Sequence, residues 1–339
     1  MYRYRGFGLI ELMIAITLGL ILSAAIIQVF LASRTTYQVQ ESLSMIQENA
    51  RFGMHFMGKE IRMSGYMGCN SLGNVNVNVI AKPASAVAFV PLLGENNVGN
   101  SNDFNALPGS DTLEIKRGSD EMITLTGNLA LGNDQLRIED NTHNFVKGDY
   151  LLASDCSSAD IFRITNAPKK AGEGTTTLIH DTSANSSSNL SKVYGADTDI
   201  YGFETTRFFV RDTGRTNASG QAIYSLFSQQ RAIGSGGTMG AAVELIEGVE
   251  NLQLEYGIDA NEDRAIDRYV DASLVSDWNT VVSVKVELTL VGNDPGVVGQ
   301  TGQTDAQSVY DSAGQLLNNA DGRMRQVVSS VFAVRNRLQ

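Results

Sequence analysis

The sequence has little of what metal centres and nucleic-acid interfaces require. Two cysteines and three histidines among 339 residues are too few for a Cys/His metal centre. The 37 acidic residues outnumber the 26 lysines and arginines, and a net charge of −11 argues against a general nucleic-acid binder, because such proteins carry a basic face. We therefore expect no direct contact with nucleic acid.

Catalytic motifs are also absent from the sequence. His55, His143 and His180 are isolated from one another, and there is no Walker loop and no Gly-x-Ser-x-Gly elbow. The segment Gly234–Gly240 is rich in glycine but lacks the dinucleotide-binding spacing. The sequence therefore predicts neither an enzyme nor a bound organic cofactor.

A long apolar run lies close to the N-terminus. Phe7–Ile27 contains one ionisable residue, Glu11, and no lysine or arginine occurs between Arg5 and Arg34. A helix needs about 20 apolar residues to cross the hydrocarbon core. Since basic flanks stay cytoplasmic, the chain after Arg34 is expected on the far side of the membrane.

This run allows other interpretations. It could be a secretory signal, for which Ser23-Ala24-Ala25 offers small residues for cleavage, or a plain membrane anchor. Glu11 argues against both, because a carboxylate inside a membrane helix costs about 2.5–3.5 kcal/mol and needs a partner. If the chain is cut after Gly6, the new α-amine of Phe7 lies one helical turn away and is a candidate partner.

The helical pattern continues beyond the apolar run. No proline occurs before Pro83, so none interrupts a helix there. Apolar residues recur at helical spacing, with Gly53 in the gap: Val39, Leu43, Ile46, Ala50, Met57 and Ile61. The pattern predicts one helix from about Leu9 to Ser64, with Gly65 as its stop.

After the helix the apolar period changes to two, which predicts short strands separated by Gly, Asn, Asp and Ser. The predicted strands are Val75–Val79, Ala86–Val90, Thr112–Lys116, Met122–Thr126, Gln135–Glu139, Tyr150–Ala153, Ile161–Ile164, Thr175–Ile179, Tyr201–Val210, Ala222–Phe227, Asn251–Tyr256, Val281–Val291 and Gln326–Val334. The fold class is therefore α+β: a long N-terminal helix packed on a mainly antiparallel β-sheet head. We expect an inserted sub-lobe around residues 95–235.

Gly6, Phe7, Leu9 and Glu11, followed by the apolar run, resemble the class III signal of type IV prepilins. The resemblance implies that a prepilin peptidase cuts after Gly6 and methylates Phe7, and that Glu11 pairs with an N-terminal amine during filament assembly. The domains expected are a leader (1–6), a pilin helix (7–65, of which 7–33 spans the membrane or lies in the filament core) and a head (66–339).

Other segments resemble the PilW group of minor pilins. These are Glu60–Cys69 at the end of the helix, Leu245–Asp259 with the later Trp278 and Val281–Val291, and Val334–Leu338 near the C-terminus. The resemblance implies a structural protein of the inner membrane, with one membrane pass and a periplasmic head, that later sits at the pilus tip. It implies contacts with other minor pilins, the major pilin, a PilY-type tip adhesin and the inner-membrane assembly platform. Twitching motility, adhesion or DNA uptake would follow.

Three alternatives stay open. A J-type pseudopilin of type II secretion has the same plan and is a relative. A single-pass periplasmic protein that is never processed would also carry an apolar helix. A ligand-binding module at the tip would use the loops rich in Ser and Asn.

Cys69 and Cys156 are the only cysteines. In an oxidising compartment they are expected to form a disulfide, which would stabilise the fold by about 4–5 kcal/mol in the chain-entropy model. The alternative is two separate buried thiols.

The loop after Tyr256 is acidic. Asp259, Asn261, Asp263 and Asp267 are spaced like an oxygen-ligand calcium loop. Arg264 and Val270 depart from the EF-hand pattern, so the alternative is a solvated acidic hairpin loop.

Four arginines lie near the C-terminus with no acidic residue among them: Arg323, Arg325, Arg335 and Arg337. They could form a docking edge for an acidic neighbour. Alternatively, they extend over the sheet and pair with internal acids.

Overall fold

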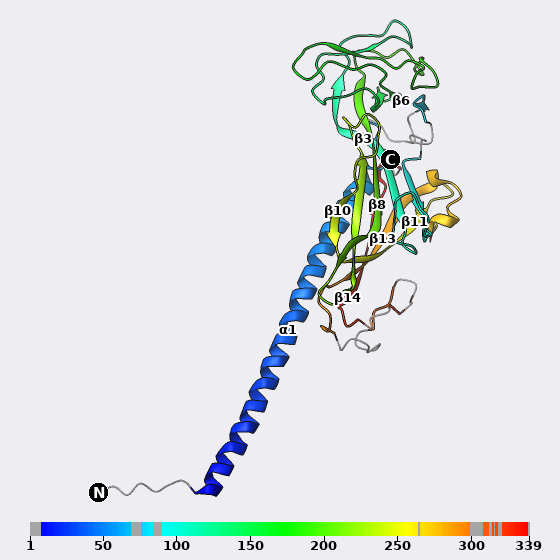
Figure 1. Ribbon diagram of the computed structural model, residues 1–339. Helices are drawn as coiled ribbons and strands as arrows, with labels where there is room; N and C mark the ends of the chain where they lie inside the picture. Colours follow the sequence, from blue (N-terminus) through cyan, green and yellow to red (C-terminus); the bar gives the residue numbers. More distant parts are fainter. Residues whose placement is uncertain are drawn as a thin grey trace. The chain divides into compact units, whose positions relative to one another are not determined.

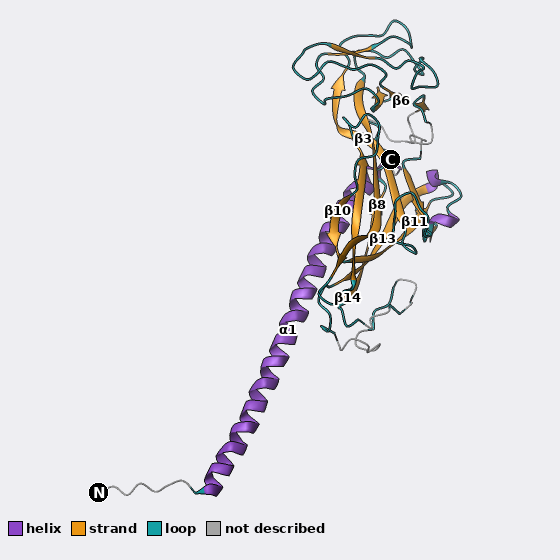
Figure 2. Cartoon of the chain, in the orientation of Figure 1, coloured by secondary structure: helices purple, strands orange, loops and turns teal. Residues whose placement is uncertain are grey.

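The computed structural model describes residues 8–68, 76–83, 90–263, 265–298, 308–311, 314, 316–317 and 321–337. The chain divides into two compact units, residues 1–48 with 291–325, and residues 49–290 with 326–339. Figure 1 shows the order of the elements, and Figure 2 shows that strands dominate the chain after one long helix.

Helix α1 runs without a break from Leu9 to Met63. The predicted start is confirmed, and the predicted end differs by one residue. No proline lies within this helix, so every residue can continue the ladder of hydrogen bonds from residue i to residue i−4. The helical stripe is also confirmed, since Ile46, Ala50, Met57 and Ile61 are all buried.

In the first unit, the N-terminal part of α1 is apolar and its large side chains are exposed, from Leu9 to Leu31. The helix is long and apolar enough to cross a membrane. The hydroxyl of Thr17 donates to the carbonyl oxygens of Met13 (3.1 Å) and Ile14 (2.9 Å), so this polar group is satisfied within the helix. Internal satisfaction of polar groups is what a lipid environment demands.

The strands of the described residues form three sheets. The largest has eight strands, ordered β1-β6-β5-β8-β3-β2, with β9 on β8 and β10 on β9. Its strands are β1 (Asn76–Val79), β2 (Leu92–Glu95), β3 (Thr112–Thr124), β5 (Tyr150–Ser154), β6 (Ser158–Arg163), β8 (Asp199–Thr216), β9 (Ala222–Arg231) and β10 (Val243–Glu247). All these pairings are antiparallel except β1 with β6.

A four-stranded sheet has the order β12-β11-β13-β14, and β4 pairs with β7 in a sheet of two. Their bounds are β4 (Leu136–Ile138), β7 (Thr176–Leu178), β11 (Val249–Ile258), β12 (Arg268–Val270), β13 (Val281–Val291) and β14 (Arg325–Ala333). Short 3-10 helices cover Ala272–Leu274 (η2), Trp278–Thr280 (η3) and Arg335–Arg337 (η4). The α+β prediction with mainly antiparallel sheets is confirmed.

Two predicted strands prove to be one. The structure joins Thr112–Lys116 and Met122–Thr126 into β3, which pairs with β8 on both sides of a register shift between Gly118 and Met122. Of the predicted strand Ala86–Val90, residues 86–89 lie outside the described residues and only Val90 is described. A hydrophobic cluster that includes Leu136, Phe145, Phe162 and Leu178 lies around the β4–β7 sheet. The boundaries of the sub-lobe stay a prediction.

The C-terminal part of α1 packs closely on the strands of the second unit. A Cβ on Gly53 would lie 2.3 Å from Cδ1 of Ile246, and a Cβ on Gly58 would lie 2.4 Å from Cε1 of Phe332. A Cβ at Gly58 would overlap the Phe332 ring, whereas a Cβ at Gly53 would require only the end of the Ile246 side chain to shift. The Phe56 ring meets Phe208 edge to face, with centroids 5.9 Å apart. These contacts fix the helix against β8, β10 and β14.

Asp111 joins the two larger sheets. Its backbone amide donates to the carbonyl oxygen of Leu252 in β11 (2.8 Å). Its carboxylate accepts hydrogen bonds from the amides of Leu254 (2.7 Å) and Asn97 (2.8 Å). Burial raises the pKa of Asp111 to about 6, although the two backbone hydrogen bonds oppose the shift.

We expect this buried carboxyl group to make stability depend on pH. Its pKa is about 6 in the folded chain against 3.8 ordinarily, so the folded state binds the proton more tightly. The contribution of Asp111 to the free energy of unfolding should therefore fall by about 2 kcal/mol as the pH rises from 4 to 7. Chemical denaturation of the wild type and of Asp111→Asn at pH 4 and pH 7 gives the free energy of unfolding of each. The difference between the two proteins should change between the two pH values.

Exposed Asp103 supplies the matched control, because Asp103→Asn changes the net charge by the same amount. A difference between wild type and Asp111→Asn that is the same at pH 4 and pH 7 would contradict the assignment.

Candidate functional site

Glu11 lies in the first turn of α1 and is exposed. Its Oε2 accepts a hydrogen bond from the amide of Gly8 (3.0 Å), and its own amide donates to the carbonyl oxygen of Gly8 (3.0 Å). This pairing satisfies one of the amides left free at a helix start. Among the described residues Glu11 has no ion-pair partner. Gly6 and Phe7 lie outside the described residues.

The end of the helix is tied to β3 by a buried ion pair. Arg117 Nε lies 3.1 Å from Glu60 Oε2, and both side chains are less than a tenth exposed. Arg117 Nη1 also lies 2.8 Å from Asp120 Oδ1. Burial alone would lower the pKa of Arg117, but the carboxylates of Glu60, Asp120 and Glu204 outweigh it and raise the pKa. The sequence did not predict this pair; its one signal is that Glu60 is next to the apolar stripe residue Ile61.

The helix C-terminus is held by three separate segments. The amide of Gly65 donates to the carbonyl oxygen of Lys116 (2.9 Å), and Ser64 Oγ donates to that of Pro91 (2.9 Å). The side-chain amide of Asn336 donates to the carbonyl oxygen of Ser64 (2.9 Å). The junction segment and the C-terminal segment, both noted as similar to PilW proteins, therefore meet at one point.

The third such segment forms β10 and β11, and its Tyr256 is fully buried. The ring of Trp278 meets Tyr256 edge to face, with centroids 4.8 Å apart. Ile246 of the same segment is the residue that packs on Gly53 of the helix. Two of the three segments therefore reach the last part of α1, the C-terminal segment through Asn336 and the third through Ile246.

In the acidic loop, the carboxylates accept hydrogen bonds from the loop's own backbone. The amide of Asp263 donates to Asp259 Oδ1 (3.2 Å) and to Asn261 Oδ1 (3.1 Å). The amide of Ala260 donates to Asp267 Oδ2 (2.8 Å). Within the described ranges no group of three or more acidic, His or Cys side chains is arranged to hold a metal. Calcium binding stays a prediction, which a melting temperature that does not respond to calcium would refute.

Two of the C-terminal arginines pair internally, within the first unit. Arg325 makes a bidentate pair with Asp321 (2.7 and 2.8 Å), and Arg323 Nε lies 2.7 Å from the same carboxylate. Partial burial raises the pKa of Asp321, but these hydrogen bonds outweigh it and lower the pKa. For Arg323 and Arg325, the structure therefore agrees with the alternative that they pair with an internal acid. Arg335 is exposed, the side chain of Arg337 is outside the described residues, and docking through these two stays a prediction.

Cys156 occupies the turn between β5 and β6, where its φ is 70°. Cys69 lies outside the described residues, so the Cys69–Cys156 disulfide stays a prediction.

If these cysteines form a disulfide, replacing either one should remove the same bridge. We expect Cys69→Ser, Cys156→Ser and the double variant to show the same loss, about 4–5 kcal/mol of unfolding free energy. Chemical denaturation measures the loss, and mass spectrometry of the unreduced wild type counts the thiols. Two free thiols, or losses that add in the double variant, would refute the bridge.

The chain matches two family models. Residues 207–336, from within β8 to η4, match the Type IV Pilus-assembly protein W family, and residues 1–27 match the prokaryotic N-terminal methylation motif. None of the curated proteins and none of the solved structures matches the chain. The predicted resemblance is confirmed at both ends: residues 207–336 match the PilW family, and residues 1–27 match the N-terminal methylation motif.

Proposed function

We propose that this chain is a structural minor pilin that helps to initiate type IV pilus assembly and becomes part of the pilus tip. The observation that carries the proposal is the combination of a methylation motif over residues 1–27 with a PilW match over residues 207–336. The matched family is a structural pilus component, which agrees with the absence of catalytic motifs from the sequence.

The first step of the proposed mechanism is membrane insertion. The apolar part of α1 holds the subunit in the inner membrane, with the head in the periplasm. There Glu11 is costly, because the amide of Gly8 at 3.0 Å is a weak partner for a carboxylate surrounded by lipid.

The second step is processing and pairing. Prepilin peptidase cuts after Gly6 and methylates Phe7, and the new N-terminal ammonium group of a neighbouring subunit becomes available to Glu11. An ammonium group pairs with a carboxylate more strongly than a neutral amide does, and low dielectric strengthens the pair further. Exchange of the Gly8 amide for this partner favours assembly and fixes the axial position of the subunit.

The third step depends on the head. The end of α1 is tied to the head through Glu60, which lies 3.1 Å from Arg117. A large acidic head does not pack freely along a shaft, which favours the tip. There it would contact other minor pilins, the major pilin and a PilY-type adhesin, with roles in twitching, adhesion or DNA uptake. The PilW match favours this reading over a J-type pseudopilin of type II secretion.

We expect Glu11 to be required for assembly and dispensable for insertion. In a strain deleted for this gene, neither Glu11→Ala nor Glu11→Lys should restore surface pili, because neither side chain can pair with an ammonium group. Electron microscopy and sheared-pilus yield measure piliation, and immunoblots of membranes show whether each variant accumulates.

Glu41→Ala is the matched control, since Glu41 is an exposed glutamate of the same helix beyond the apolar run, and it should restore pili fully. Normal pili in the deletion strain, or with both Glu11 variants, would contradict the proposal.

A further inference from the structure

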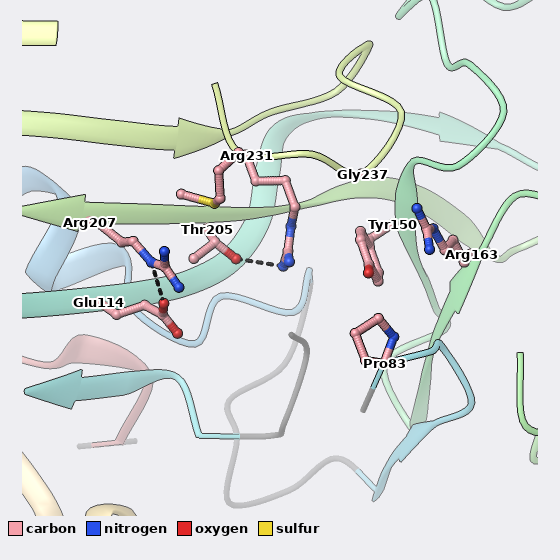
Figure 3. A pocket seen from close by; sticks show the side chains of 9 residues that line it. Pro83, Glu114, Tyr150, Arg163, Thr205, Arg207, Arg231 and Gly237 are labelled. Atoms are coloured by element: carbon pink, nitrogen blue, oxygen red, sulfur yellow. Dashed lines mark hydrogen bonds and ion pairs between the residues drawn. The ribbon is translucent and has the colours of Figure 1, made fainter. Parts of the chain in front are cut away.

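The second unit contains a cavity of about 320 Å³ lined by three arginines. Figure 3 shows Arg207 and Arg231 on strands on one side, with Tyr150 and Arg163 opposite. The rest of the lining is Pro83, Glu114, Thr205, Gly237 and Met239. The cavity takes no part in the proposed assembly mechanism.

Sheet register brings the charged residues together. Glu114 of β3 faces Arg207 of β8, and Thr205 of β8 faces Arg231 of β9. Arg207 Nε donates to Glu114 Oε2 (2.6 Å), and Arg231 Nη2 donates to Thr205 Oγ1 (2.6 Å). Both hydrogen bonds lie across adjacent strands, so the sheet holds the two guanidinium groups in place.

Glu114 does not neutralise the cavity. Its Oε1 lies 3.1 Å from Lys116 Nζ, which is buried behind the lining, and its Oε2 is held by Arg207. Burial raises the pKa of Glu114, but Lys116 and Arg207 outweigh it and lower the pKa. One carboxylate is therefore shared between two cations, while Arg163 and Arg231 add two more positive charges.

Arg163 is fixed by neutral acceptors. Its Nε donates to the carbonyl oxygen of Gly148 (2.7 Å), and its Nη groups donate to those of Gly236 (3.2 Å) and Lys82 (3.3 Å). These carbonyl groups orient the guanidinium group without cancelling its charge.

The glycine-rich segment Gly234–Gly240 forms one wall. Asp149 accepts hydrogen bonds from the amides of Gly234 and Gly236, both at 2.8 Å, so this nearby carboxylate is committed to the segment. Gly237 has a φ of 80°, and a Cβ there would lie 2.9 Å from both Arg163 Nη2 and Tyr150 Cε2. Only glycine allows the backbone so near these side chains.

Tyr150 completes the cationic lining. The guanidinium carbons of Arg231 and Arg163 lie 4.2 and 5.0 Å from its ring centroid. Burial, together with nearby Arg207 and Arg163, lowers the pKa of Arg231, while Tyr150 and Glu114 oppose the shift. Buried cations gathered around one space are costly, and an anion in that space would offset the cost.

We propose that this cavity binds a small organic molecule of about monosaccharide size through its carboxylate or phosphate oxyanion. Guanidinium forks match the paired oxygens of both groups. The volume is near the lower end for ligand pockets, which suits one sugar ring. The chain carries a net charge of −11, so a cavity of opposite sign would select oxyanions locally.

The test uses the full-length protein in neutral detergent and titration calorimetry at matched ionic strength. The probes are sodium phosphate and sodium galacturonate, with sodium chloride and galactose as controls. We expect saturable binding of phosphate, galacturonate or both, and none of chloride or galactose. The probe that binds more tightly shows whether the cavity prefers a phosphate or a carboxylate.

Arg231→Gln should weaken binding roughly 10- to 100-fold, the equivalent of one charge-assisted hydrogen bond. The matched control is Arg215→Gln, since Arg215 lies on the same strand β8 as Thr205 but is exposed and paired with Glu244 and Glu247. Binding to this variant should equal binding to the wild type. An equal loss in both variants would overturn the proposal, as would a wild type that binds neither probe.

Glu114→Gln gives a test that damage to the fold does not mimic. Glu114 is the one carboxylate among the described lining residues, and its loss should tighten oxyanion binding, because one competing acceptor and one negative charge are removed. This variant decides the question if Arg231→Gln does not fold. Unchanged or weaker binding to folded Glu114→Gln would overturn the proposal, as would binding of an acidic peptide when neither small probe binds.

Discussion

Glu11 is the single ionisable side chain of the apolar run Phe7–Ile27, and its carboxylate accepts a hydrogen bond from the Gly8 amide at 3.0 Å. Hydrocarbon makes this arrangement unfavourable, since a carboxylate there needs more than one neutral donor. In the proposed mechanism, the requirement for a stronger partner links the sequence to an assembly function: the helix that would anchor the subunit would also favour its pairing with a neighbour. An anchor with an all-apolar run would be stable by itself and would gain nothing from assembly.

Helix α1 runs from Leu9 to Met63, and its C-terminal part lies in the second unit with the head strands. Its last turns approach the strands so closely that a Cβ at Gly58 would overlap the Phe332 ring, and a Cβ at Gly53 would displace the end of the Ile246 side chain. The buried pair of Glu60 and Arg117 locks the same region to β3. Breaking such a pair leaves an uncompensated buried charge, so we infer that the junction resists bending.

The sequence predicted the helix and the strand Val281–Val291 with nearly correct ends, because both have long uninterrupted patterns. It missed β2, β10 and β12, which are three to five residues long and depend on their partner strands for pairing. Its prediction for Glu11 rests on the cost of a carboxylate in a membrane helix and on the resemblance to prepilins, and it stays a prediction. It could not reveal the arginine cavity, because Arg163, Arg207 and Arg231 meet only through strand register and the glycine-rich segment that packs against them.

The account rests on a new chain start being available to pair with Glu11. The most direct measurement is the N-terminal mass and sequence of the protein purified from cell membranes and pili. The account predicts a chain that begins with N-methylated Phe7, which places an amine four residues before Glu11. An intact Met1, or a start after Ala25 that removes Glu11 altogether, would contradict it.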